Sequence, residues 1–406
     1  TEIYTLSLHD ALPISWERGK RLAALAAQHR SLILLDGLEP LQYPADLLRG
    51  KLKDPALEMF LKTFAKQSQG LCVVTTRVPL AGLERAAERL QQHDLELLSP
   101  EACSIILRTR GVSGSEEKIR QTALNFGGHA LAINLLAEYL HALPGHPIEA
   151  ADDIADLPGV PPEKGKHPRR VIEALFRQLL AKGKSDEASV LPLLGLFDRA
   201  ITEAALETVT ALLPQPPNLH KTLAALRQIK LLYKASDHAP GEVDCHPLIR
   251  EHFEDYLQKN EPDLYRAAHE RLYEYYKNLP EKHLPDTLDE MEPLFYAIAH
   301  GCRAGKELVQ KAFYEIYYLK ILRSGDTNYC CKQLGAFGPD LTALSWFFER
   351  MWDKPSRKLR EDHQAFVLYC AGFRLRALGR LNEGLQPMKT GREWLIRNKE
   401  WLNAAT

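Results

Sequence analysis

Two short apolar runs are each followed by residues suited to binding phosphate or a metal ion: Asp36 and Glu39 after residues 32–35, and Thr75, Thr76 and Arg77 after residues 71–74. A carboxylate such as Asp36 is a typical ligand of Mg²⁺, which takes only one or two of them beside phosphates. Glu39 is suited to orient or deprotonate an attacking water. The Arg77 guanidinium matches the oxygens of a terminal phosphate, and the hydroxyl of Thr76 matches a phosphate or that water.

The elements that must position these side chains are two strands and two helices. Residues 18–29 and 56–66 have the apolar spacing of amphipathic helices, and each precedes one of the apolar runs. Buried strands separated by a helix predict a parallel β-sheet with helical crossovers. The carboxyl ends of such strands meet at one sheet edge, where α/β proteins bind their ligands. Taken alone, Asp36-Gly37 is equally typical of a β-turn, and Arg77 of a solvated loop. The two runs together, about 40 residues apart, favour a site.

Composition excludes several classes of protein. The 406 residues are 45% hydrophobic, and 52 Lys and Arg nearly cancel 53 Asp and Glu, so overall charge gives no bias toward nucleic acid or membrane. Seven cysteines without a C-x-x-C pair indicate buried thiols in a reducing compartment. There is no apolar run of about 20 residues and no secretory signal. We therefore expect a soluble cytoplasmic protein without membrane contact.

The rest of the chain predicts a multidomain, mainly α architecture. We expect a foreign tail resembling translated adapter sequence over 1–15, part of an α/β domain over 16–110, and a helical subdomain with a linker over 111–160. Residues 161–258 combine helices with a two-stranded signal over 231–234 and 241–245, as in a winged helix. Residues 259–406 are expected to be helical throughout.

One segment of this last region has the spacing of a 34-residue tetratricopeptide repeat. Small and large apolar residues over 365–398 fall where that motif places them, although Gly384 stands where alanine is usual. We therefore expect a TPR-like helical solenoid, whose next repeat would open at Trp401 and is cut off. An isolated helical hairpin is the alternative. Aromatic residues such as Tyr273 and Tyr317 either line a partner groove or belong to the core.

In this order the motifs resemble the STAND class of nucleotide-binding regulatory ATPases, which includes the NB-ARC and NACHT families. The resemblance implies that residues 32–39 are the Walker B strand and that residues 72–77, with Thr75, Thr76 and Arg77, are the sensor strand. Residues 127–132 resemble the G-x-P-L-A motif beside the adenine, with Gly128 kept and Ala130 in place of proline. Residues 245–251 resemble the M-H-D motif, in which His246 would reach the β-phosphate; without the resemblance, His246 would be interpreted as a cap or packing residue.

The resembled family also has a phosphate loop, G-x-x-x-x-G-K-[S/T], which this sequence lacks. We therefore expect a fragment of a slow regulatory ATPase: the parent protein would switch with ATP, ADP and Mg²⁺, while this chain would bind nucleotide weakly. The resemblance further implies a protein partner for the repeats and a homo-oligomer in the active full-length form. Neither the effector domain nor the trigger can be named from the sequence.

Two other functions remain open. The winged-helix pattern and the basic stretch over 164–184 are compatible with a DNA-binding regulator, although nucleic-acid binding is the less favoured expectation. A TPR scaffold for protein interaction, with a decayed nucleotide module, is the other. Hydrolase motifs such as G-x-S-x-G and H-E-x-x-H do not occur.

Overall fold

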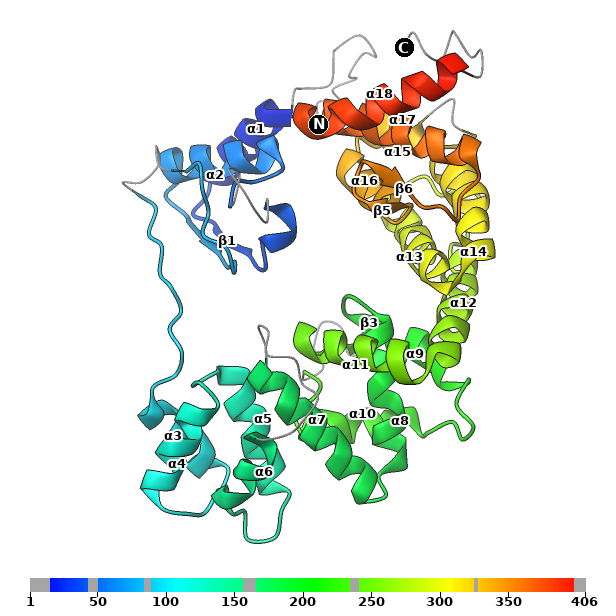
Figure 1. Ribbon diagram of the computed structural model, residues 1–406. Helices are drawn as coiled ribbons and strands as arrows, with labels where there is room; N and C mark the ends of the chain where they lie inside the picture. Colours follow the sequence, from blue (N-terminus) through cyan, green and yellow to red (C-terminus); the bar gives the residue numbers. More distant parts are fainter. Residues whose placement is uncertain are drawn as a thin grey trace. The chain divides into compact units, whose positions relative to one another are not determined.

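The computed structural model describes residues 15–42, 50–83, 89–155, 166–233, 241–324 and 328–397. The chain is mainly helical and divides into two compact units, as the multidomain, mainly α prediction required (Figure 1). Unit 1 comprises Thr1–His93, Leu284–Met291 and Val309–Thr406, and unit 2 comprises Asp94–His283 and Glu292–Leu308. The predicted foreign tail and Trp401 lie outside the described residues, apart from Ser15.

Unit 1 begins with two strands, each preceded by a helix: α1 (Ser15–Ala27), β1 (Leu32–Leu35), the short 3₁₀ helix η1 (Glu39–Leu41), α2 (Pro55–Gln67) and β2 (Leu71–Val74). The strands are parallel, with Leu32 opposite Leu71 and Leu35 opposite Val74. The two parallel strands with a helical crossover are as predicted. Asp54 starts α2 by accepting a hydrogen bond from the Ala56 N–H at 2.7 Å, and Pro55 fits the first helical position because its missing N–H has no partner there.

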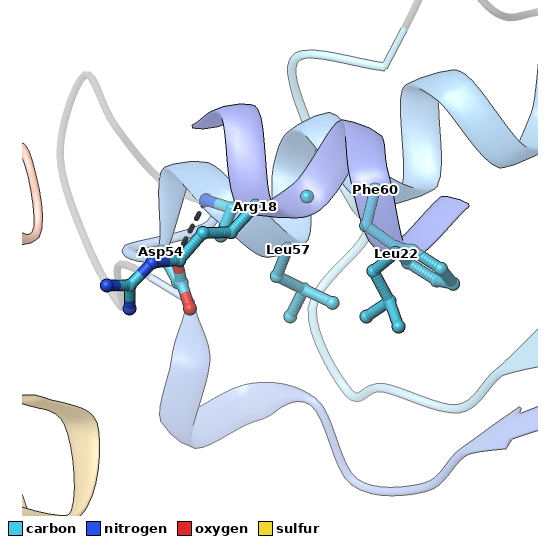
Figure 2. A pocket seen from close by; sticks show the side chains of 7 residues that line it. Arg18, Leu22, Asp54, Leu57 and Phe60 are labelled. Atoms are coloured by element: carbon cyan, nitrogen blue, oxygen red, sulfur yellow. Dashed lines mark hydrogen bonds between the residues drawn. The ribbon is translucent and has the colours of Figure 1, made fainter. Parts of the chain in front are cut away.

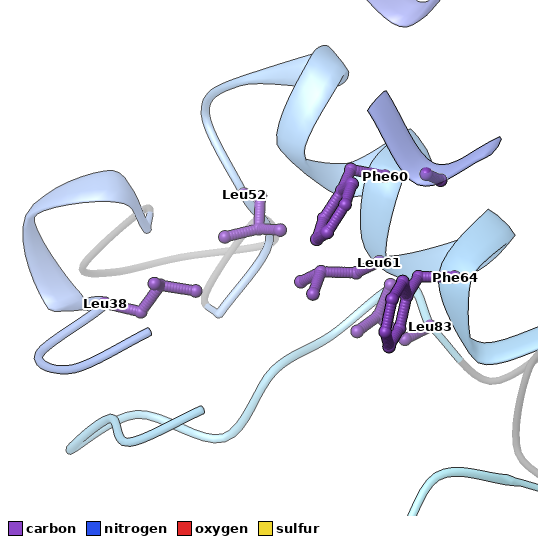
Figure 3. Packing of buried hydrophobic residues seen from close by; sticks show 7 residues of the cluster. Leu38, Leu52, Phe60, Leu61, Phe64 and Leu83 are labelled. Atoms are coloured by element: carbon purple, nitrogen blue, oxygen red, sulfur yellow. The ribbon is translucent and has the colours of Figure 1, made fainter. Parts of the chain in front are cut away.

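Both helices pack on one face of this strand pair. Figure 3 shows the buried cluster, which consists of Ala23, Leu38, Leu52, Phe60, Leu61, Phe64 and Leu83. Ile33 and Leu35 of β1 point toward this cluster, whereas Leu32 and Leu34 are 65% and 67% exposed. This alternation follows from the two-residue period of a strand. The core thus fixes β1 and β2 from one side and leaves the opposite face of the pair exposed.

The second part of unit 1 is helical with one β-hairpin. Its elements are α14 (Lys306–Lys311, from residue 309 onward), the π-helix η6 (Ala312–Ile321), α15 (Tyr329–Lys332), α16 (Phe337–Ser345), β5 (Phe348–Arg350), β6 (Lys354–Pro355), α17 (Glu361–Ala377) and α18 (Leu381–Arg397). The antiparallel β5–β6 hairpin makes the prediction of uninterrupted helix over 259–406 wrong. Helices α17 and α18 form the predicted helical pair. A Cβ on Gly372 would lie 2.3 Å from Met388 Cγ, so a small residue is required for this approach.

Unit 2 begins with helices α3 (Pro100–Thr109), α4 (Glu116–Asn125), α5 (Ala130–His141) and α6 (Asp152–Ala155), which we call the helical part. The ribbon part follows, with α7 (Lys166–Ala181), α8 (Ser185–Leu193), β3 (Ile201–Thr202), α9 (Glu203–Thr210), α10 (Leu219–Gln228), β4 (Glu242–Val243) and α11 (Pro247–Asn260). Helices α12 (Pro262–Asn278) and α13 (Leu288–Ala304, from residue 292 onward) complete the unit.

The small ribbon differs from its prediction. The strand β4 pairs antiparallel with β3, through Ile201 opposite Val243, and not with a strand over 231–234. Residues 231–233 form no strand, although the Tyr233 N–H donates to the Asp244 carbonyl at 2.8 Å. Residue 234 and the predicted connection over 237–240 lie outside the described residues. The sequence indicated a turn before β4 but not the strand that pairs with β4, because Ile201 lies about 40 residues earlier in the chain.

None of the helices in the described residues is long and apolar enough to cross a lipid bilayer.

Candidate functional site

The carboxyl ends of β1 and β2 are joined by the side chain of Thr75. Its hydroxyl donates a hydrogen bond to Asp36 Oδ1 and accepts one from the Gly37 N–H at 2.9 Å. The main chain reinforces the junction, because the Thr75 N–H donates to the Leu35 carbonyl at 2.9 Å and the Leu38 N–H donates to the Thr75 carbonyl at 3.0 Å. Gly37 has φ +68°, a conformation that glycine adopts without strain. The Asp36 carboxylate is thereby held at the sheet edge while remaining exposed to solvent.

A second contact joins the same two loops. The Arg77 N–H donates to Glu39 Oε1 at 2.6 Å, and Arg77 Nε lies 3.7 Å from the same oxygen. The Arg77 side chain is 68% exposed and that of Glu39 only 28%. The backbone contact therefore positions the carboxylate, whereas the guanidinium is largely in solvent and can reach an additional anion. The structure thus brings Asp36 and Glu39 together with Thr75 and Arg77; their chemical roles stay predictions.

Thr76 faces inward to Gln42, a residue that the sequence analysis did not single out. Gln42 is only 1% exposed. Its amide oxygen accepts from the Thr76 hydroxyl, and its amide nitrogen donates to the carbonyls of Val78 at 2.9 Å and Gly50 at 3.1 Å. Gln42 therefore connects the segment after β1 to the loop after β2. A lone glutamine in a loop carries no sequence signal for this position.

The donor set at this edge fits a hydrated Mg²⁺ and does not form a complete metal cage. Asp36 and Glu39 supply carboxylates, and the described residues contain no group of three or more His, Cys, Asp or Glu side chains that could hold a metal ion. Mg²⁺ is usually held by one or two carboxylates together with phosphate and water. The residues present match that mode in their chemistry, and binding of Mg²⁺ here stays a prediction.

A pocket of about 250 Å³ lies elsewhere in unit 1, between α1 and α2 (Figure 2). It is lined by Arg18, Gly19, Leu22, Asp54, Ala56, Leu57 and Phe60. Asp54 uses a carboxylate oxygen to cap α2, as the dashed line in Figure 2 marks. Because the remaining lining is mostly apolar and includes none of the predicted site residues, this pocket is not part of the candidate site.

Gly128 and Ala130 lie in unit 2, at the start of α5. Gly127 and Gly128 have φ of +62° and +59°, and a Cβ on Gly128 would lie 2.4 Å from the Leu98 carbonyl oxygen. The Leu98 N–H in turn donates to the Gly128 carbonyl at 2.8 Å. The glycine is thus needed for close backbone approach. Ala130 begins α5 after the N-cap residue His129, and its predicted contact with adenine stays a prediction.

His246 also lies in unit 2, at the start of α11. Its Nδ1 accepts a hydrogen bond from the Leu248 N–H at 3.2 Å, so His246 is the N-cap of this helix and Pro247 occupies the first helical position. Cys245, before it, is buried, and burial raises the pKa of its thiol to about 12. His246 therefore has the capping role that the sequence allowed as the alternative to a phosphate contact. A contact from His246 to a β-phosphate stays a prediction.

No protein-family model matches the chain, and no curated protein matches it. Among solved structures, the chain is similar to a signal transduction ATPase with numerous domains (STAND) that has a tetratricopeptide repeat sensor, from Pyrococcus horikoshii, with 14% sequence identity and a TM-score of 0.46. The match covers 96% of this chain and 55% of that one, so the chain spans about half the length of this structure. The class of protein defined by the chain's own elements is a multidomain, mainly helical one with a parallel strand pair.

Proposed function

We propose that this chain is part of a nucleotide-switched signal-transduction regulator of the STAND class, in which the α17–α18 region contributes to a sensor for a protein partner. The observation that carries the proposal is the convergence of Asp36, Glu39 and Arg77 where β1 and β2 end. Two acids and an exposed guanidinium at the carboxyl edge of parallel strands form a suitable environment for a Mg²⁺-bound triphosphate.

Each residue has a distinct task in this proposal. Asp36, oriented by Thr75, holds one position of the hydrated Mg²⁺, which when bound neutralises phosphate charge. Glu39, oriented by the Arg77 N–H, accepts a proton from the attacking water or fixes its direction. Arg77 Nε is 3.7 Å from Glu39, so its exposed guanidinium can shift toward a γ-phosphate. Loss of that phosphate on hydrolysis would release Arg77 and signal the change of state.

The same proposal includes weak nucleotide binding by this chain. Its sequence contains no G-x-x-x-x-G-K-[S/T] loop, whose backbone N–H groups and lysine supply most of the phosphate affinity in such proteins. In the full-length parent, the predicted contacts of Gly128, Ala130 and His246 with ATP or ADP would join those of the strand edge. Slow hydrolysis and oligomer formation belong to that parent.

Fluorescence titration with a labelled ATP analogue tests the proposal. We expect the chain to bind it with a Kd above about 100 µM in Mg²⁺, and Asp36→Asn and Arg77→Ala to weaken binding at least about five-fold. Arg21→Ala, an exposed arginine on α1, is the control and should have no effect. Asp36→Asn should lose its effect in EDTA. Micromolar affinity would contradict the weak-binding part, and equal affinities of wild type and both variants would contradict the site.

The ion pairs of the basic stretch over 164–184 weaken the case for a DNA-binding function. Arg169 pairs with Glu251 and Asp255 at 3.3 and 2.9 Å, and Arg177 pairs with Glu173 at 2.6 Å. Cations that are already paired within the chain are less available to neutralise DNA phosphates, so their binding releases fewer counterions from the DNA. A gel shift with duplex DNA tests this alternative, and salt-dependent binding that is lost on replacement of the Lys and Arg residues over 164–184 would favour it.

A protein-interaction scaffold is the other alternative. Leu381, Leu385 and Met388 of α18 follow helical spacing and are 63%, 55% and 38% exposed. An exposed apolar stripe of this kind is compatible with a helical partner. The scaffold function does not require nucleotide, so full retention of partner binding by Asp36→Asn and Arg77→Ala in the full-length protein would favour it.

A further inference from the structure

One carboxylate in unit 2 receives cations from both the helical part and the ribbon part. Glu138, on α5, is only 5% exposed. Arg110, at the end of α3 in the helical part, places Nε 2.9 Å from Glu138 Oε1. Lys230, after α10 in the ribbon part, places Nζ 3.4 Å from the same oxygen. A buried carboxylate is thus shared between a cation of its own part and a cation of the other part.

Further contacts surround this carboxylate at the C-terminal end of α5. Lys182 Nζ donates to the Ala142 carbonyl at 2.7 Å, and Gln178 Nε2 to the Tyr139 carbonyl at 3.5 Å. Both donors belong to the end of α7 or the residue after it. The last carbonyls of a helix lack partners and carry partial negative charge, so cations stabilise them. These polar contacts lie beside the packing of α5 against α7, in which Leu140 and Leu179 are buried. The polar contacts, unlike the apolar ones, can be exchanged for water.

The backbone of Lys230 points to a role for its side chain. Lys230 has φ +57°, the left-handed conformation in which glycine is usual after a helix. The chain makes the corresponding turn, because the N–H groups of Lys230 and Leu231 donate to Arg227 and Leu226 carbonyls, each at 3.1 Å. A lysine is strained in this conformation and glycine is not. The presence of lysine at a position that favours glycine is explained if the lysine side chain makes a contact that glycine cannot make.

We propose that the Lys230–Glu138 ion pair is a releasable latch that holds the ribbon part against the helical part, and that it opens during the conformational switch. The opening rests on the proposed function; the latch contact does not. The arrangement suits release because Arg110 stays beside Glu138 when Lys230 leaves. A buried carboxylate without any partner is strongly unfavourable, and Arg110 prevents that outcome. Lys230 is 43% exposed on its side chain, so water can replace its contact.

Hydrogen–deuterium exchange of the full chain tests the latch. Lys230→Gly removes the cation and relieves the backbone strain, and Lys230→Asn removes the cation at a residue that tolerates the same conformation. We expect both variants to raise amide exchange in residues 136–143 and 178–183 by about two- to five-fold, the range of a partly exposed ion pair. Exchange within α8 and α11 should stay at the wild-type value. Lys230→Arg, which keeps the cation, should behave as wild type.

Salt and nucleotide separate the possible results. Raising NaCl from 50 to 500 mM should increase exchange at the same residues more in wild type than in Lys230→Gly, which keeps only the Lys182 and Arg110 contacts. Unchanged exchange in both neutral variants, or a uniform rise through α7–α11, would overturn the latch. If the variants behave as expected but millimolar Mg²⁺-ATP leaves exchange in wild type unchanged, the latch contact stands and its opening by nucleotide in this chain is contradicted, whereas the proposed nucleotide site is tested separately by the fluorescence titration.

Discussion

The hydroxyl of Thr75 links the ends of β1 and β2 by donating to the Asp36 carboxylate while accepting from the Gly37 N–H. A single side chain therefore sets the orientation of the acid proposed to hold Mg²⁺. Because Thr75 immediately follows β2 and Asp36 immediately follows β1, the parallel register of the two strands determines whether they meet.

Replacing Thr75 tests how far Asp36 depends on it. Thr75→Val removes the hydroxyl but keeps the shape, so we expect a loss of about 1 kcal/mol in the free energy of unfolding, because the bonds are solvent-exposed. Nucleotide affinity should fall as well. Thr75→Ser keeps both hydrogen bonds and should restore both values. Urea denaturation and the fluorescence titration measure the two effects, and a Val variant equal to wild type in both would contradict the positioning role.

Gln42 should matter more for stability than its position in a loop indicates. Gln42→Leu removes one of two donors from each of the Gly50 and Val78 carbonyls, which also accept from the Ala81 N–H and the Thr76 hydroxyl. We therefore expect a loss of about 1–2 kcal/mol in the free energy of unfolding. Gln42→Glu has the same shape but cannot donate, and it should lose at least as much. Urea denaturation measures both. A neutral effect of Gln42→Leu would show that water replaces the amide without cost.

Gly19 permits the close approach of α1 and α2. A Cβ at this position would lie 2.0 Å from the Ala56 carbonyl oxygen, and a backbone atom cannot move aside as a side chain can. Gly19→Ala should therefore cost about 1–3 kcal/mol, despite the better helix propensity of alanine. Lys20→Ala, at the exposed neighbouring position, is the control and should change stability by less than about 0.5 kcal/mol. Thermal unfolding compares the two variants.

The buried histidine pair of α12 and α13 should make unit 2 sensitive to acid. His269 Nδ1 and His300 Nδ1 are 2.9 Å apart, and burial lowers the pKa of His300 to about 3. The unfolded histidine binds a proton below about pH 6.5, whereas the folded one does not. Stability is therefore complete above pH 6.5 and falls by up to about 1.4 kcal/mol per pH unit between that value and the folded pKa.

His300→Asn should remove the contribution of His300 to this acid sensitivity. Urea denaturation between pH 7.5 and 5.0 should then show a smaller fall in the free energy of unfolding per pH unit. His269 contributes in the same direction, because burial also lowers its pKa. Some pH dependence of the free energy of unfolding should therefore remain in His300→Asn. A variant with the same slope as wild type would contradict the assignment of the acid sensitivity to His300.

The Arg374–Asp340 pair connects α17 to α16 inside unit 1. Both side chains are fully buried, and Arg374 also donates to Asn328 Oδ1 at 2.9 Å. Arg374→Leu leaves the Asp340 carboxylate buried without its cation, so we expect a loss of about 3–5 kcal/mol. The double variant Arg374→Leu with Asp340→Leu should be more stable than that single variant. Thermal unfolding compares them, and an additive loss would contradict the pairing.

The sequence determined the positions of most elements because their signals lie in consecutive residues. The apolar period of α1 and α2 and the strand-like runs before Asp36 and Thr75 could all be recognised locally. The start of α3 is a local feature of the same kind, because Ser99 directly precedes the helix and its side chain accepts from the Ala102 N–H at 3.2 Å as an N-cap. Of the two alternatives given for Tyr273 and Tyr317, the structure shows the core, since both side chains are fully buried. The β5–β6 hairpin was missed because it is short and lies between helical segments.

What only the tertiary structure decided is which distant residues meet. The Thr75–Asp36 bond, the Gln42–Val78 contact and the Lys230–Glu138 pair each join residues more than 30 positions apart. Such pairs depend on strand register and helix packing, which many sequences with the same local pattern would arrange differently. The apolar periodicity of the sequence therefore specified the helices and strands. The contacts that define the roles of individual polar residues form only when those elements pack together.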